Sequence, residues 1–264
     1  MKPPTVFLGE MTTLEVEAFL KEHHTVIIPV GATEQHGPHG PLLTDVLIPQ
    51  EVARRAAPRL NAVVAPPVNY ALSYPHVGFK GLVYLRIPTF MSMIEDIAAA
   101  FGAVGFKRII FLNGHYDNTY ALAYACANAA ERLPEDARAY PLNYWDGMPA
   151  EVREKYSSLE KGMHANAAET SAILAINPKL VDMDKANAEF PNFPEFTVNS
   201  APVHTAFFFS NPRSVYWATK SGTWGDARSA NPQTGEDYIE AGVASTIAVI
   251  ENVEKTFAAI PRRD

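Results

Sequence analysis

The sequence is poor in cysteine, with Cys126 the only one among 264 residues. A single cysteine cannot form a disulfide within the chain, and it excludes a metal site built from several thiolates. A metal site in this chain would therefore have to use histidine, aspartate and glutamate side chains.

The sequence also lacks long apolar runs and basic clusters. No apolar run approaches the ~20 residues needed to span a bilayer, and the opening MKPPTVFLGEMTT has no apolar stretch typical of a signal peptide. The 22 lysines and arginines are scattered along a chain of net charge −7, so no basic stripe can follow a phosphate backbone. We therefore expect a cytoplasmic protein whose partner is neither a membrane nor a nucleic acid.

Hydrophobic residues, in contrast, are plentiful. They make up 47% of the chain against 19% for charged residues, which is enough to bury a large core. No repeat or low-complexity segment divides the sequence, and its length suits one large α/β domain. We therefore predict a single domain over residues 1–264.

Strand and helix patterns alternate along most of the chain. Apolar runs predict strands at 25–31, 61–70, 107–114 and 137–145. Apolar residues at helical spacing predict helices at 14–24, 44–60, 92–104, 118–132, 167–176 and 236–260. This alternation favours an α/β fold in which helices cover both faces of a mostly parallel central sheet.

Three segments do not follow this alternation. Residues 146–161 are polar, and the segment 222–236 has the composition of a loop. Residues 181–216 are irregular, which indicates either a plain packed loop or an excursion over the surface or into a subunit contact.

The loops after two predicted strands contain the candidate catalytic and metal-binding side chains. Ligands of open parallel sheets bind beyond the carboxyl ends of the strands, so these loops are where a site is expected. The first, GATEQHGPHGPLLTD, contains Glu34, His36, His39 and Asp45, and the second, NGHYDN, contains His115 and Asp117.

Both loops place a carboxylate and an imidazole two residues apart. Residues i and i+2 of an extended segment project to the same side, so Glu34 pairs with His36, and His115 with Asp117. Asp45 is predicted at the head of a helix, where its carboxylate is suited to bridging two ions. Imidazole nitrogens and carboxylate oxygens suit Zn²⁺, Mn²⁺ or Fe²⁺, and bound dications would offset the repulsion between clustered acids.

A third segment, GMHANAAETS, places His164 and Glu169 at the start of a predicted helix. With an ordinary pKa of about 6.5, His164 is a candidate general acid or base, and Glu169 and Ser171 are candidates to orient a ligand. Plain structural explanations exist for each feature alone: Asp45 as a charge at a helix start, HYDN as a turn, and His164 as a helix cap or surface residue. The occurrence of both loops at strand ends favours a metal site.

The three motifs resemble those of the creatininase (creatinine amidohydrolase) family. The segments that carry the resemblance are PVGATEQHGPHGPLLTD, FLNGHYDN and HANAAETS, with weaker matches in YLRIPTF and SGTWGDARSANPQTGE. The similarity spans about residues 25–245. It implies the family fold, a three-layer α/β/α sandwich, and the family's usual assembly as a homohexamer.

The resemblance also implies a centre of two divalent metal ions, Zn, Mn or Fe. It assigns Glu34, Asp45 and His115 to one ion and His36, Asp45 and Asp117 to the other. Asp117 stands where creatininase has a glutamate. His164 matches the family's catalytic histidine and Glu169 the acid of its E-T-S motif, and whether Glu169 binds a metal or orients a ligand stays open.

Substrate contacts carried over from the family fall on Ser73, His76, Tyr116 and Trp145. The loop that holds the first two is shorter here than in creatininase. Creatininase has an acidic residue before the catalytic histidine and a tryptophan slightly upstream that closes over the creatinine ring. These places hold Met163 and Glu160 in this chain. These differences favour a small polar substrate other than creatinine.

Taken together, the motifs predict a metal-dependent hydrolase. Water held between two metal ions would attack a carbonyl carbon, and His164 would protonate the leaving group. The leading hypothesis is hydrolysis of a C–N bond in an amide or cyclic amide. Two alternatives stay open: ring-opening of a cyclic ketone by C–C cleavage, with a substrate of the 3-dehydro-scyllo-inosose type, and a non-catalytic metal-binding oligomer.

Overall fold

The computed structural model of the chain describes residues 5–156, 161–191 and 201–260. Its centre is a parallel sheet of four strands in the order β2-β1-β3-β4. The strands are β1 (Thr25–Val30), β2 (Ala62–Val64), β3 (Arg108–Asn113) and β4 (Arg138–Asn143). The predicted second strand stops early because Pro66 and Pro67 have no N–H groups to donate to a neighbouring strand.

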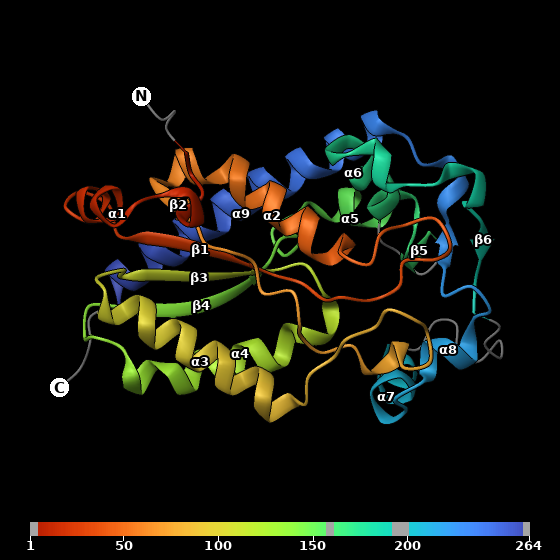
Figure 1. Ribbon diagram of the computed structural model, residues 1–264, viewed down its shortest axis with the longest axis horizontal. Coiled ribbons are helices and arrows are strands. Elements are labelled where there is room, and N and C mark those ends of the chain that lie inside the picture. The colour runs from red at the N-terminus through yellow and green to blue at the C-terminus, as the bar shows by residue number, and fades with distance from the viewer. Residues whose placement is uncertain (1–4, 157–160, 192–200, 261–264) are drawn as a thin grey trace.

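Helices cover both faces of this sheet (Figure 1). One layer contains α2 (Thr44–Ala56), α6 (Ala167–Ile176) and α9 (Pro232–Ala259), and the other contains α3 (Ile87–Ala103) and α4 (Thr119–Ala129). The short helix α1 (Thr13–Phe19) packs Val16 and Phe19 against the second layer's core. The predicted three-layer α/β/α sandwich is confirmed.

Alternating side chains of β1 divide the core into two. Ile27 packs under α2 and α9, whereas Val26, Ile28 and Val30 pack against α3 and α4. All six residues of the strand are buried, as expected for a parallel strand with helices on both faces. The strands and helices predicted from the apolar pattern therefore form the two-sided core, and the loops that hold the site connect them.

The irregular segment 181–216 contains more regular structure than its composition predicts. It contains β6 (Ala188–Glu189), α7 (Ala201–Ser210) and the start of α8 (Ser214–Ala218), so the prediction of irregular chain is wrong for these parts. Residues 192–200 lie outside the described residues. Another helix, α5 (Ala150–Tyr156), occupies the polar stretch. Elements this short, or this uniformly apolar, show no clear sequence period.

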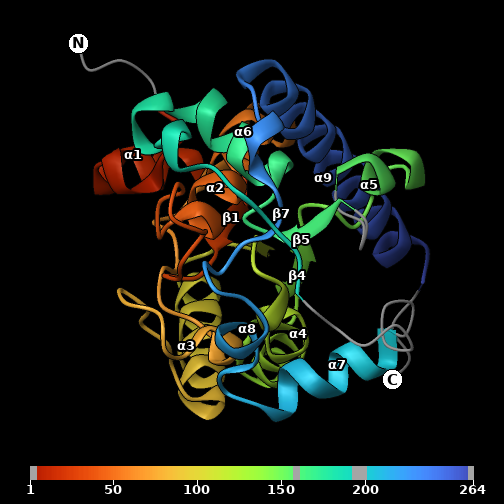
Figure 2. The ribbon, with the colours of Figure 1, turned by 90° about the vertical axis from the view of Figure 1, so that its right-hand side faces the viewer.

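A second, antiparallel sheet joins these segments in the order β5-β7-β6, where β5 is Gly162–His164 and β7 is Trp224–Asp226 (Figure 2). Tyr216 of α8 packs its ring edge-on against Phe79, and Phe209 of α7 packs on Tyr116, which follows β3. The excursion therefore lies at the carboxyl end of the main sheet.

No helix within the described parts of the chain is long and apolar enough to cross a membrane. The division of the chain into one domain, 1–264, stays a prediction.

Candidate metal centre

The loops after β1 and β3 meet at the carboxyl end of the sheet, against the start of α2. Two glycines allow this close approach. A Cβ atom added to Gly31 would lie 2.4 Å from the main-chain oxygen of Asp45, and one added to Gly114 would lie 2.3 Å from the same atom. No side chain fits at either position, so the PVG and NG endings of the two strands bring Asp45 between the loops.

Asp45 lies between two histidines from different loops. Its Oδ1 is 3.2 Å from His36 Nε2, and its Oδ2 is 2.9 Å from His115 Nδ1. All three side chains are buried. One carboxylate therefore faces both halves of the site.

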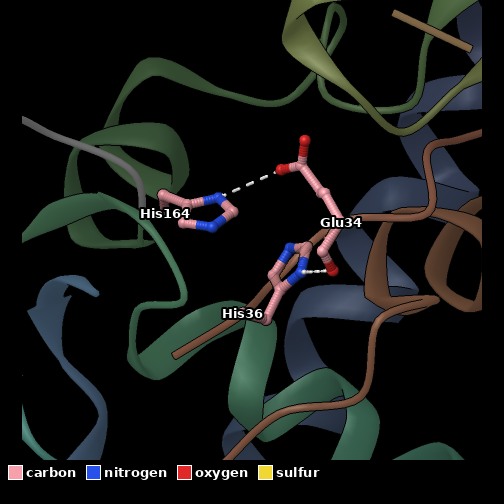
Figure 3. A group of neighbouring side chains, drawn as sticks. All are labelled: Glu34, His36 and His164. Carbon is pink, nitrogen blue, oxygen red and sulfur yellow. Dashed lines mark hydrogen bonds and ion pairs between the residues drawn. The ribbon is translucent and has the colours of Figure 1, made fainter. Parts of the chain in front are cut away.

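The buried carboxylates and histidines form overlapping clusters in which the possible ligand atoms lie within 4.8 Å of one another. The clusters are Glu34 with Asp45 and His115, His36 with Asp45 and Glu169, and Glu34 with His36 and His164. Figure 3 shows the last of these, with the imidazole of His164 directed at the carboxylate of Glu34. Asp45 is shared by the first two.

One sequence-predicted residue, Asp117, groups differently from the arrangement implied by the family resemblance, and Glu169, whose role was left open, joins a ligand cluster. Glu169, in the first turn of α6, joins His36 and Asp45. Asp117 lies instead beside His115, with 3.7 Å between its Oδ2 and His115 Nε2. Glu169 therefore lies on the His36 side of Asp45, where the resemblance places Asp117, and Asp117 lies on the His115 side.

Several buried atoms that face this site make no hydrogen bond with the described residues. They are Glu34 Oε1, His115 Nε2, Asp117 Oδ2 and Glu169 Oε2. Buried polar atoms are nearly always paired, and those that are not call for a specific explanation such as an ion. Their donor types, carboxylate oxygen and imidazole nitrogen, fit Zn²⁺, Mn²⁺ or Fe²⁺.

The electrostatics of the site are strongly perturbed. Burial raises the pKa of Glu34 to about 8, and it also raises the pKa of Glu169. Burial acts to lower the pKa of His36, but the charge and hydrogen bond of Asp45 outweigh it and raise the value to about 9. Carboxylates crowded away from water are costly without a compensating cation, and such shifts concentrate at functional sites.

Two further histidines approach Glu34. Burial lowers the pKa of His164 to about 3 and lowers that of His76 well below its ordinary value. His164 Nδ1 lies 3.6 Å from Glu34 Oε1, and His76 Nε2 lies 3.4 Å from the same oxygen. Both imidazoles are therefore neutral near pH 7 and carry one proton each.

The residues expected to contact substrate are spread around the site. Ser73 is fully buried, and its hydroxyl donates to Glu34 Oε2, so it braces that carboxylate. Tyr116 is half-exposed beside Phe209. Trp145 packs edge-on against Tyr144 just after β4, with 4.9 Å between ring centroids. The substrate roles of these side chains and of His76 stay predictions.

Sequence reasoning missed Gln35, which lies inside the first motif. Strict alternation would point its side chain away from Glu34 and His36. The loop is not a regular strand here, and the Gln35 amide contacts both His76 and His164. Its place between two candidate ligands was the only signal in the sequence.

Asn118 holds two of the site loops together. Its amide donates to the main-chain oxygen of Gly31 and to Asn113, and its Oδ1 accepts from the Leu72 N–H. We expect Asn118→Ala to lower the free energy of unfolding by about 1–3 kcal/mol, because these buried groups lose their partners. Denaturant unfolding measures this loss.

The matched control is Asn128→Ala, which removes an exposed hydrogen bond to Glu95. We expect it to change the free energy of unfolding by less than about 0.5 kcal/mol. Equal effects of the two substitutions would contradict the role given to Asn118.

The sequence model of the creatininase family, described as creatinine amidohydrolase, matches residues 9–250. The chain belongs to the creatininase family. The resemblance inferred from the three motifs is thereby confirmed, and the chain is a hydrolase of this family whose buried carboxylates and histidines can form a metal site.

Curated relatives in the family act on different substrates. Creatinine amidohydrolase from Pseudomonas putida is 31% identical over 265 residues, covering 92% of this chain and 96% of the relative. Mycofactocin precursor peptide peptidase from Mycolicibacterium smegmatis is 31% identical over 238 residues, covering 87% and 84%. A 3-dehydro-scyllo-inosose hydrolase from Thermotoga maritima is 29% identical over 193 residues, covering 70% of this chain and 60% of the relative.

Solved structures agree with the family assignment. A crystal structure of creatininase superposes with a TM-score of 0.80 at 28% identity, covering 95% of this chain and 98% of the other. A manganese form of creatininase superposes with a TM-score of 0.79 at 28% identity over 94% and 98% of the two chains. Structures of the family therefore include one with a divalent metal.

Proposed function

We propose that this chain hydrolyses a C–N bond, in an amide or cyclic amide of a small polar substrate, with two divalent metal ions as cofactors. The observation that supports this most directly is the position of Asp45. Its two carboxylate oxygens face two buried clusters of imidazole and carboxylate, as a residue bridging a pair of ions would.

The clusters suggest which residues hold each ion. Glu34, Asp45 and His115 would hold one, with Asp117 beside His115 as a further oxygen donor. His36, Asp45 and Glu169 would hold the other. In this assignment Glu169 takes the place that the resemblance gave to Asp117 at the second ion, and Asp117 moves to the first.

Ions bound at these residues supply a water that ionises near pH 7 and polarise the carbonyl of the substrate. The protein's own contribution is to hold the ligands and to move protons. His164 faces Glu34 across 3.6 Å and is neutral, so it can take a proton at one stage and return it to the leaving nitrogen at another. Ser73 keeps the Glu34 carboxylate in place.

The names of the relatives favour C–N cleavage. An amidohydrolase and a peptidase both break C–N bonds, and the first of these aligns over nearly the whole of both chains. The inosose hydrolase supports the alternative, ring-opening of a cyclic ketone, but this chain spans only 60% of its length. Tyr116, Trp145 and the half-exposed Met163 are the side chains we propose to select the substrate. Met163 stands at a position that differs from creatininase, and this difference favours a substrate other than creatinine.

The remaining parts of the proposal rest on the family resemblance for the assembly and on the composition of the chain for its location and partners. We propose a homohexamer in the cytoplasm that binds neither nucleic acid nor membrane. Size-exclusion chromatography with light scattering tests the assembly directly.

Removal of metal is expected to destabilise the protein. A ligand present at 100 times its Kd stabilises a folded protein by about 2.7 kcal/mol, and dialysis against a chelator would remove that amount. We expect elemental analysis to find about two ions per chain, and the unfolding temperature to fall after chelation and recover when Zn²⁺ or Mn²⁺ is added back. A chain that binds no divalent ion would overturn the proposal.

The substrate class is tested with a panel of lactams, formamides, short peptides and cyclic ketones. We expect turnover of at least one C–N substrate by the metal-loaded protein and none after chelation. Turnover restricted to the ketones would favour the ring-opening alternative.

A further inference from the structure

Gln35 contacts two histidines of the site from a buried position that the proposed mechanism does not use. Its side chain lies between the rings of His76 and His164 and reaches the main chain of Gly222. The residue is only 6% exposed. These contacts determine where the protons of both rings reside.

The orientation of the Gln35 amide is set by two main-chain groups. The N–H of Gly37 donates to Gln35 Oε1 over 2.8 Å. At the other end, Gln35 Nε2 donates to the carbonyl oxygen of Gly222 over 3.1 Å. A donor faces the oxygen and an acceptor faces the nitrogen, so the amide has one consistent orientation.

The main chain of Gln35 determines the tautomer of His164. The Nε2 atom of His164 lies 2.7 Å from the carbonyl oxygen of Gln35. A carbonyl oxygen only accepts, so Nε2 must carry the proton. The unprotonated nitrogen is then Nδ1, which faces Glu34 Oε1 (Figure 3).

The Gln35 amide determines the tautomer of His76 in turn. Its Nε2 lies 2.9 Å from His76 Nδ1 and 3.0 Å from His164 Nε2. The latter already carries a proton and cannot accept, so the second amide hydrogen goes to His76 Nδ1. The proton of His76 therefore resides on Nε2, directed at Glu34 Oε1.

We propose that Gln35 is a positioning residue: its carbonyl and amide keep the lone pair of His164 Nδ1 and the N–H of His76 Nε2 directed at Glu34. The consequence for catalysis rests on the proposed function. In the resting site His164 receives a proton on Nδ1 before it can donate one. The tautomers themselves can be measured without any turnover.

Gly222 keeps the amide in its place. The backbone of Gly222 has φ of +87°, and a Cβ atom added there would lie 2.1 Å from Gln35 Oε1. Gly222→Ala therefore displaces the amide without changing Gln35 itself. Gly105 provides the control, because it also has a positive φ, +108°, but an added Cβ would meet only Leu20, at 3.8 Å.

The primary test is Gln35→Met, which preserves length and removes the amide. We expect kcat to fall by about 10–100-fold, the usual cost of losing a group that orients a metal ligand, because the N–H of His76 is no longer held toward Glu34. KM should change less than about threefold, and metal content should be unchanged. Gly222→Ala should reproduce this loss and Gly105→Ala should not. In a His76→Ala background, Gln35→Met should cost much less than it does alone, because the lost amide acts through His76.

A second readout is the ¹⁵N chemical shifts of the histidine side chains in metal-free protein. We expect His76 to be protonated on Nε2 in the parent chain and to become a tautomer mixture in Gln35→Met and in Gly222→Ala. His164 should stay protonated on Nε2 in both variants, because the carbonyl of Gln35 is unchanged. A Gln35→Met protein with the parental His76 tautomer and parental kcat would overturn the proposal. Absence of metal binding or hydrolysis in the parent chain would overturn the proposed function alone, since the tautomer measurement stands without them.

Discussion

Asp45→Ala is expected to abolish metal binding and hydrolysis together. Asp45 is the one side chain common to both clusters, and its oxygens lie 3.2 and 2.9 Å from His36 and His115. Its loss leaves each cluster with fewer ligands and leaves the histidines without their carboxylate partner. We expect bound metal to fall from about two ions per chain to well under one, and kcat/KM to fall by about 10³-fold or more, because several kcal/mol of transition-state stabilisation is lost.

Two companion variants separate charge from structure. Asp45→Asn keeps the size of the side chain but removes the charge, so it should lose most of the metal while remaining folded. Asp96→Ala removes an exposed carboxylate paired with Arg132 at 2.8 Å and should leave metal content and turnover unchanged. An Asp45→Ala protein that kept both ions and full turnover would refute the two-metal proposal.

His164→Ala is expected to separate metal binding from turnover. The proposed ligands of both ions remain, so elemental analysis should still find about two ions per chain. The proton transfer is lost, and kcat should fall by about 10²–10⁴-fold, the usual contribution of a general acid or base. Steady-state kinetics on any substrate identified in the panel measures this fall.

The control for this variant is His23→Ala. His23 packs its ring on Phe19 of α1, with 5.4 Å between centroids. It precedes β1, whereas the site loop follows that strand, so His23 lies at the opposite end of the sheet. The His23→Ala variant should leave kcat unchanged. A His164→Ala protein with parental kcat would assign His164 to structure, and one that lost its metal would make His164 a ligand, as its cluster with Glu34 and His36 also permits.

The parts of the fold that could be predicted from sequence are those with a long, regular period. The strand at 107–114 and the helix at 236–260 were recognisable because buried faces impose their spacing on many residues at once. The second sheet was not, since β5, β6 and β7 contain two or three residues each and are held by pairing with distant segments. Their formation depends on neighbours that no local pattern reveals.

The candidate site divides in the same way. Residue types and loop positions alone predict Glu34, His36, Asp45 and His115 as site residues. The sequence could not predict how these residues group around each ion. Whether Glu169 or Asp117 lies beside His36 depends on how α6 packs on α2. Gln35 was missed for a related reason: its partners, His76, His164 and Gly222, come from three other parts of the chain.

By itself, then, the sequence determined the chemistry available to this protein. A chain with one cysteine and carboxylate–imidazole pairs after its strands can bind divalent metals only through oxygen and nitrogen. Only the tertiary structure decided which of these atoms share an ion and which nitrogen of each histidine carries a proton. Ligand type is a property of single residues, whereas distances and hydrogen-bond partners arise when separate loops are packed against one another.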